Sequence, residues 1–179
     1  MKSFSIFISP KWLRPALVLV LFCTSLQAQE RGNVAKDQFS LATVCGDYGA
    51  IATYGANVAR ALGYEVMDGH GSLHGAATVN QPGPNDTTRS ISQIGISGTY
   101  TVDANGRGSM NLVIALPGGG SGNVVEDFVI TKAKMINGVL IATEIQDMQQ
   151  VPSAVIDDSS LVIHTYTLRR VLKSCISGH

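Results

Sequence analysis

Three glycine-containing turns constrain the fold of this chain more than any other feature of its sequence. Two are near copies, DGHGSL at residues 68–73 and NGRGSM at residues 105–110, and the third is the shorter pair Asn137-Gly138. An Asp-Gly or Asn-Gly pair between strand-like runs indicates a two-residue β-turn, because both central residues of that turn need a positive φ. The three motifs therefore predict three β-hairpins.

Runs rich in apolar and β-branched residues flank these turns. They cover residues 63–67, 72–79, 91–102, 109–116, 124–135, 139–145 and 161–171. The segments at residues 80–89, 118–122 and 147–160 are predicted to be irregular, because they contain proline, repeated glycine or clustered polar residues that end a ladder.

An eighth strand is expected near the start of the domain, in a stretch that fits two patterns. Apolar residues within 47–62 fall at helical spacing, whereas residues 48–54 also read as a strand with two apolar faces. Two glycines in the stretch disfavour a long helix, at about 1 kcal/mol each relative to alanine. We expect a strand followed by a short helix or turn around residues 56–61.

The pattern as a whole predicts an all-β fold of about eight strands, with at most one or two short helices. Sequential antiparallel strands joined mostly by tight turns form an up-and-down barrel or a sandwich. We expect a single small antiparallel barrel, with a β-sandwich as the alternative. The barrel domain is expected to cover residues 41–176, between a disordered lead at residues 29–40 and a tail at residues 177–179.

Residues 1–28 have the pattern of a secretory signal peptide. The leading part is basic, residues 16–23 form an apolar core, and Ala28 is a small residue suited to signal peptidase. The apolar core is shorter than the roughly 20 residues that span a bilayer. We expect cleavage after Ala28 and export to the bacterial periplasm or medium, with no membrane span in the mature protein. An uncleaved anchor is the alternative.

Charge and length narrow the class of partner. Three of the 13 basic residues lie in the leader and none of the 13 acidic residues does, so the mature chain would carry a formal charge of about −3. Nucleic acid is not expected as a partner, because the sequence has no basic stripe with interleaved aromatic residues. The roughly 150 remaining residues suit one domain with a sizeable core.

Two cysteines remain after the leader, Cys45 just before the first strand-like run and Cys175 just after the last. An exported protein meets conditions that permit disulfides. We predict a Cys45–Cys175 bond, which would make the two ends of the fold neighbours and favours a sheet that closes on itself. Two unpaired thiols are the alternative.

Several segments together support a resemblance to a known group of proteins. They are AIATYGANVARALG, DGHGSLHG, VNQPGPN, SGTYTVDANGRG, EDFVITKAKMINGVLIATEI and the terminal HTYTLRR. The chain resembles a family of small exported bacterial proteins of unknown function, over essentially the whole mature length. In strand and turn layout that family is similar to the eight-stranded barrels of allene oxide cyclases and dirigent proteins. The resemblance implies a barrel fold and no catalytic residue, because fold analogy does not establish function.

The turn motifs offer only weak metal-binding candidates. Asp68 and Asp103 begin loops that resemble fragments of calcium sites, but neither loop supplies the spaced oxygen donors and distal glutamate of an EF-hand. His70 and His74 flank the first turn and, with Asp68, could form a zinc or copper site. Their spacing matches no established ligand pattern, so turn chemistry and solvated histidines are favoured. We expect no metal and no other cofactor.

Three residues of the last two strand-like runs are weak catalytic candidates. His164 and Tyr166 share one face of their strand, because side chains alternate with period two. Glu144 would be an interior carboxylate if the face it shares with Leu140 and Ala142 lines the barrel, and burial would then raise its pKa and suit it to acid–base work. The favoured alternative is that Glu144 points to solvent beside Lys132 or Lys134.

Three functions fit this sequence. The first is an exported barrel that binds a small hydrophobic ligand without a metal, since eight strands give about the right diameter. The second is a structural or interaction protein of the periplasm or cell surface, with a solid core. The third is an enzyme of the cyclase or isomerase type, so the question of enzyme activity stays open. A hollow barrel would favour the first or third function over the second.

Overall fold

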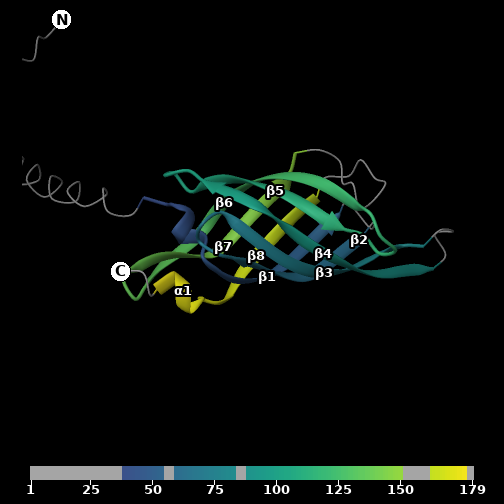
Figure 1. The fold of residues 1–179 in the computed structure, drawn as a ribbon, viewed down its shortest axis with the longest axis horizontal. Coiled ribbons are helices and arrows are strands. Elements are labelled where there is room, and N and C mark those ends of the chain that lie inside the picture. The colour runs from purple at the N-terminus through teal and green to yellow at the C-terminus, as the bar shows by residue number, and fades with distance from the viewer. Residues whose placement is uncertain (1–37, 55–58, 84–87, 151–161, 177–179) are drawn as a thin grey trace, which may run out of the picture. The chain divides into compact units, whose positions relative to one another are not determined.

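The protein forms a closed antiparallel barrel of eight strands in sequence order (Figure 1). A computed structural model describes residues 38–54, 59–83, 88–150 and 162–176. The strands are β1 (Gly46–Tyr54), β2 (Ala59–Met67), β3 (Ser72–Pro82), β4 (Arg89–Val102), β5 (Arg107–Ala115), β6 (Ser121–Ile136), β7 (Val139–Gln149) and β8 (Val162–Arg170). The barrel closes because β1 pairs with β8 as well as with β2. The all-β barrel prediction is confirmed, and the β-sandwich alternative is wrong.

The three turn motifs form hairpins of two kinds. Asn137 and Gly138 both have positive φ, at 52° and 83°, as the two-residue turn requires. In the two near copies only glycines have positive φ, among them Gly69 at 80° and Gly106 at 84°. Each of these loops has four residues between its strands, 68–71 and 103–106, so both are longer than predicted. The Asp103 N–H donates to the Arg107 carbonyl at 2.7 Å, which closes a wider turn.

The ends of the domain meet at one end of the barrel, which we call the η1 end. Here the short 3-10 helix η1 (Leu41–Val44) precedes β1, and the four-residue helix α1 (Lys173–Ile176) follows β8 (Figure 1). Cys45 and Cys175 are joined by a disulfide with an S–S distance of 2.05 Å, so this prediction is confirmed. The opposite end, where β1 ends and β8 begins, is called the far end.

Large side chains fill the barrel at the η1 end. They are Val44, Tyr48, Met67, Leu73, Tyr100, Met110 and Phe128, all buried in one cluster. The two tyrosine hydroxyls are satisfied there: Tyr48 donates to the Ala142 carbonyl at 3.0 Å, and Tyr100 accepts from the Gly69 N–H at 2.8 Å. This half of the interior is therefore a packed apolar core.

Glycine replaces larger residues where an inward-facing position is crowded. A Cβ atom on Gly75 would overlap the Tyr64 carbonyl oxygen and lie 2.9 Å from the Cγ atom of Glu65, and one on Gly63 would lie 2.5 Å from the Ala76 carbonyl oxygen. Real Cβ atoms do not approach so closely. Gly63 and Gly75 thus let the backbones of β2 and β3 approach closely beside the buried Glu65.

Several predicted strand boundaries are wrong. β3 continues through Pro82 and β4 begins at Arg89, so both ends of the loop predicted at residues 80–89 belong to strands, and β6 begins at Ser121 within the segment predicted to be irregular. Residues 59–61, expected to be helix or turn, already belong to β2, and β7 continues through Gln149 into the segment predicted to be irregular. Residues 38–40, expected at the end of a disordered lead, include Phe39, which packs against the core and whose N–H donates to the Ala104 carbonyl. The extension of β7 matters most, because it carries Asp147 into the barrel.

Several predictions fall on other parts of the chain. The leader at residues 1–28, most of the lead and the tail at residues 177–179 lie outside the described residues. Among the helices that are described, none has the length and apolar character needed to cross a membrane.

Candidate functional site

The far half of the barrel interior contains a cavity. About 40 Å³ is accessible to the centres of water-sized spheres, several times the roughly 10–15 Å³ that one water needs. On β1 to β3 its wall consists of small residues, namely Ala50, Ala52, Ala61, Gly63 and Ala77. On β4 to β6 it consists of branched aliphatic residues, namely Ile94, Ile96, Leu112, Ile114 and Val124. The cavity exists because the small residues face the branched ones without filling the space between.

Polar side chains gather on one side of this cavity, and we call them the polar cluster. They are Tyr54, Glu65, Glu126, Asp147, His164 and Tyr166. All except Asp147 line the cavity. Strand register explains the gathering, because Asp147 pairs with His164 across β7 and β8 and with Phe128 on β6, two residues beyond Glu126. Three carboxyl groups, one imidazole and two phenols, all buried or largely buried, therefore lie in an apolar barrel.

Asp147 and His164 form the shortest contact in the cluster. The Asp147 Oδ1 atom lies 2.6 Å from the His164 Nδ1 atom and accepts a hydrogen bond from the His164 backbone N–H at 3.0 Å. Two bonds to one oxygen fix the imidazole ring against β7. Such an aspartate–histidine contact holds the histidine in one orientation and directs its other ring nitrogen elsewhere.

This contact sets the charges of the pair. Burial acts to lower the pKa of His164, but the hydrogen bond and negative charge of Asp147 outweigh it and raise that pKa to about 9. Burial acts to raise the pKa of Asp147, but the bond and charge of His164 hold it below its ordinary value. The pair is an imidazolium and a carboxylate at neutral pH.

Glu126 and Glu65 have no such partner. Burial, reinforced by the charge of Asp147, raises the pKa of Glu126 well above its ordinary value, although its Oε1 atom lies 3.5 Å from the His164 Nδ1 atom. Burial raises the pKa of Glu65 to about 7, against the opposing charge of His164. Glu126 therefore holds its proton to a higher pH than an exposed glutamate does, and Glu65 gains or loses its proton near neutral pH.

Two tyrosines border the histidine. The Tyr166 hydroxyl donates to the Glu65 Oε1 atom at 3.4 Å. The rings of Tyr54 and Tyr166 lie 6.4 Å and 5.9 Å from the His164 ring, centroid to centroid. Burial, followed by neighbouring carboxylates, raises the pKa of Tyr54 to about 12 and that of Tyr166 well above its ordinary value. Both hydroxyls stay protonated and can act as hydrogen-bond donors.

Glu126, Asp147 and His164 are the group in the described part of the chain whose donor atoms could hold a metal ion, since these atoms lie within 4.8 Å of one another. Donor atoms around an ion with bonds of about 2.1 Å lie roughly 3 Å or more apart. The 2.6 Å contact of Asp147 and His164 is shorter and is a hydrogen bond. The geometry fits the hydrogen-bonded pair better than a metal centre.

The three catalytic candidates from the sequence separate in the structure. His164 and Tyr166 face the interior and join the polar cluster. Glu144 lies on the outer surface, where it accepts hydrogen bonds from Lys132 Nζ at 2.7 Å and from Thr131 Oγ1 at 2.8 Å. The interior alternative for Glu144 is wrong, because irregular pairing of β6 with β7 around Lys132 breaks the alternation on which it depended.

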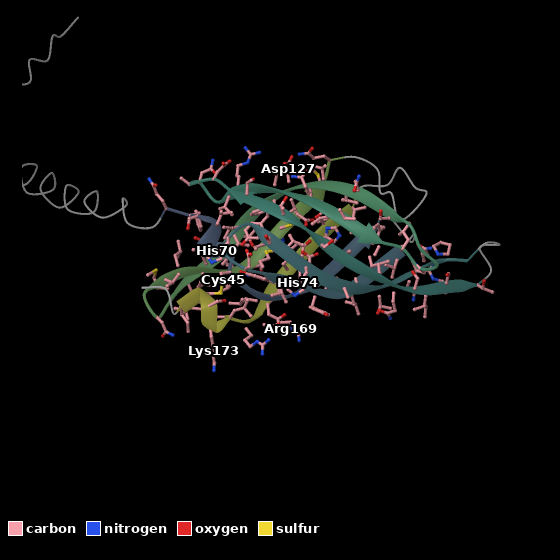
Figure 2. All side chains as sticks on the ribbon, viewed as in Figure 1. Cys45, His70, His74, Asp127, Arg169 and Lys173 are labelled. Atoms are coloured by element: carbon pink, nitrogen blue, oxygen red, sulfur yellow. A yellow bond between two sulfur atoms is a disulfide. The ribbon has the colours of Figure 1, made fainter. Side chains whose placement is uncertain are left out.

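The histidines of the first turn lie outside the cavity. His70 and His74 are both exposed; Figure 2 labels His70 near Cys45 and His74 farther along β3. Asp68 Oδ1 accepts hydrogen bonds from the His70 and Ser72 backbone N–H groups, at 2.7 Å and 3.0 Å. Asp68 therefore closes its own turn, as the turn interpretation predicts.

Sequence reasoning missed the acidic members of the polar cluster. Glu65 and Glu126 lie at positions that alternate with large apolar residues: Glu65 is two residues before Met67, and Glu126 lies between Val124 and Phe128. An acid in phase with the apolar face of a strand is the signal that would have found them. Asp147 has no such alternation with apolar residues to mark it, because the sequence predicts an irregular segment at residues 147–160.

No known protein family, no curated protein and no solved structure matches this chain. Functional conclusions therefore rest on the barrel and on the residues inside it.

Proposed function

We propose that the barrel binds a small, mostly apolar molecule that carries one polar group. The observation that carries this proposal is the interior cavity, with aliphatic walls on β1 to β6 and polar side chains on one side. Ligand sites usually have this composition: largely apolar, with a few polar groups that orient the ligand. A hollow interior also supports ligand binding over a purely structural role, for which a solid core would suffice.

Four alanines of the wall provide a direct test. We expect benzyl alcohol or benzylamine to shift the methyl resonances of Ala50, Ala52, Ala61 and Ala77 in a saturable manner in alanine-labelled protein. Filling the cavity with Ala61→Leu should weaken binding about tenfold or more, because overpacking costs about 1–3 kcal/mol. Ala115→Leu, at an exposed position of β5, is the matched control and should bind normally. Absence of saturable shifts with either compound would reject the proposal.

We further propose that the protein is exported after cleavage of residues 1–28 and that it belongs with the small exported barrels that resemble allene oxide cyclases and dirigent proteins. The Cys45–Cys175 disulfide supports export, since such bonds persist in oxidising compartments. The eight-stranded closed barrel supports the likeness at the level of fold. N-terminal sequencing of the exported protein would check the first point: a retained Met1 would contradict it.

A second candidate function is proton-transfer catalysis of the isomerase or cyclase type. One contrast favours it: the pKa of Glu65 is raised to about 7, while that of His164 is raised to about 9. A site with a base that ionises near neutrality and a protonated imidazole nearby has the components of acid–base catalysis. Deuterium incorporation next to the carbonyl of a small ketone such as cyclohexanone would test it, with Glu65→Gln expected to abolish exchange and Glu144→Gln to leave it unchanged.

A further inference from the structure

The interior of the barrel has more acidic groups than basic ones. Glu65, Glu126 and Asp147 are 2%, 2% and 4% exposed, whereas every lysine and arginine in the described segments is exposed. His164 is the one basic side chain in the polar cluster, and it is already bonded to Asp147. Three carboxyl groups therefore share one basic side chain. Its Nδ1 atom bonds to Asp147 and lies 3.5 Å from the Glu126 Oε1 atom, so Glu65 and Glu126 lack a close basic partner of their own.

These two carboxyl groups also have unused hydrogen-bonding capacity where the cavity lies. The Oε2 atoms of Glu65 and Glu126 are buried without a hydrogen-bond partner, and both residues line the cavity. The Gln149 side-chain nitrogen, also at the cavity, is the one buried donor of the described lining without a partner. A buried polar atom left unpaired costs free energy, so these oxygens favour a ligand that donates to them.

The surroundings suit a positively charged donor. Tyr54 and Tyr166 line the same cavity, and aromatic rings attract cations. A carboxylate or phosphate group on a ligand would instead face two acidic side chains, which repel it. A hydroxyl group would donate one hydrogen bond, whereas an ammonium group donates three and brings the missing charge.

We infer that the polar group of the bound molecule is a primary ammonium, held by Glu65 and Glu126, and that the molecule is a small apolar amine. This inference rests on the proposed ligand-binding function and specifies its ligand class. The alanine and isoleucine walls hold the hydrocarbon part, and the two carboxyl groups hold the nitrogen. The Asp147–His164 pair stays intact, and the 2.6 Å bond to Asp147 is shorter than the 3.5 Å contact of the imidazole with Glu126.

The proposed ion pair has a defined pH dependence. The titratable groups that line the cavity are Tyr54 on β1, Tyr64 and Glu65 on β2, Glu126 on β6, and His164 and Tyr166 on β8. Asp147 on β7 bonds to His164 beside them. Aliphatic ammonium groups stay charged up to about pH 10. Binding should therefore strengthen as the pH rises from 6 to 8, because Glu65, with a pKa raised to about 7, loses its proton over that range.

The test compares three compounds with one ring and different polar groups: benzylamine, benzyl alcohol and benzoate. Titrations followed by calorimetry and by the alanine methyl resonances, at pH 8 with EDTA in every buffer, should show benzylamine binding about tenfold or more tightly than benzyl alcohol, with benzoate weakest. The preference for the amine should shrink at pH 6. This comparison uses the unaltered protein and does not depend on any variant folding.

Isosteric variants locate the site. Glu65→Gln and Glu126→Gln each replace an acidic group with a neutral amide of the same shape, and each should reduce benzylamine affinity about tenfold while changing benzyl alcohol affinity little. Glu144→Gln removes a carboxylate from the outer surface and should leave both affinities unchanged. Circular dichroism and thermal melting check that each variant is folded.

The outcomes separate the inference from the function on which it rests. If benzyl alcohol or benzoate binds at the alanine wall as tightly as benzylamine, the ammonium inference is wrong and the ligand-binding function stands. If none of the three compounds binds, the ligand-binding function itself is wrong. Benzylamine affinity that is the same in folded Glu65→Gln and Glu126→Gln as in Glu144→Gln would also overturn the inference.

Discussion

The two halves of this barrel are made by the same strands but are filled differently. At the η1 end, Tyr48, Met67, Met110 and Phe128 fill the interior. Toward the far end, the same strands present alanine, glycine and a set of buried acids around a cavity. The comparison shows that the two halves of one small barrel can have different roles. The packed half stabilises the closed sheet, so the other half can contain a cavity and unpaired polar atoms.

The largest expected effect tests the packed half. Phe128→Ala should lower the free energy of unfolding by about 3–5 kcal/mol, because it leaves a void in a crowded core. Ile94→Ala, which only enlarges the existing cavity, should cost about 2 kcal/mol, the low end of the range for such changes. Urea denaturation of both variants measures the difference. Equal losses would mean that the two halves are equally packed.

The disulfide should contribute somewhat less. It closes a loop of 130 residues at the η1 end, for which the chain-entropy model gives up to about 5 kcal/mol and typical measurements about 2–4 kcal/mol. The double variant Cys45→Ser, Cys175→Ser should therefore unfold at lower urea while retaining a β-sheet circular dichroism spectrum. If it also lost benzylamine or benzyl alcohol binding while still folded, the far half would depend on the η1 end more closely than the comparison holds.

A smaller, pH-dependent effect tests the cavity half. The pKa of Glu65 rises from an ordinary 4.5 to about 7 on folding, so the folded protein holds more protons than the unfolded chain between these values. Stability should therefore fall by a few kcal/mol as pH rises from about 4.5 to 7. His164, raised from 6.5 to about 9, acts in the same direction, and its contribution is lost as pH rises through 9.

The Glu65→Gln variant isolates this contribution. It should reduce the dependence of stability on pH between 4.5 and 7, measured by urea denaturation at several pH values, and the remaining slope comes from Glu126, whose pKa is also raised. Glu144→Gln, in which an exposed carboxyl group is changed, should retain the slope of the original protein. A slope that is the same in Glu65→Gln and the original protein would show that Glu65 is not the group responsible.

The barrel fold could be predicted because short sequence motifs mark its turns and its two ends. The Asp-Gly and Asn-Gly pairs mark hairpins, and Cys45 and Cys175 bracket the strands they join. Local signals could not identify the polar cluster, because which face of a strand points inward depends on pairing. Glu144 shows the difficulty: irregular pairing beside Lys132 places it outside, whereas Asp147, three residues later, is inside. His164 and Tyr166 were found because their strand alternates regularly.

Closure of the sheet also limits how this protein can associate with other protein chains. Each strand pairs on both sides over part of its length, β1 with β2 and β8, so the closed wall of the barrel has no edge strand with a free row of backbone N–H and C=O groups. Strand ends that extend past a neighbour, such as residues 130–136 of β6, pair on one side. An open edge strand is the usual route to strand addition and aggregation. Association through the barrel wall must therefore use side chains, such as Ile51 and Leu62, which lie opposite each other and are 54% and 64% exposed. Surface substitutions can change such assembly without disturbing the backbone pairing inside each barrel.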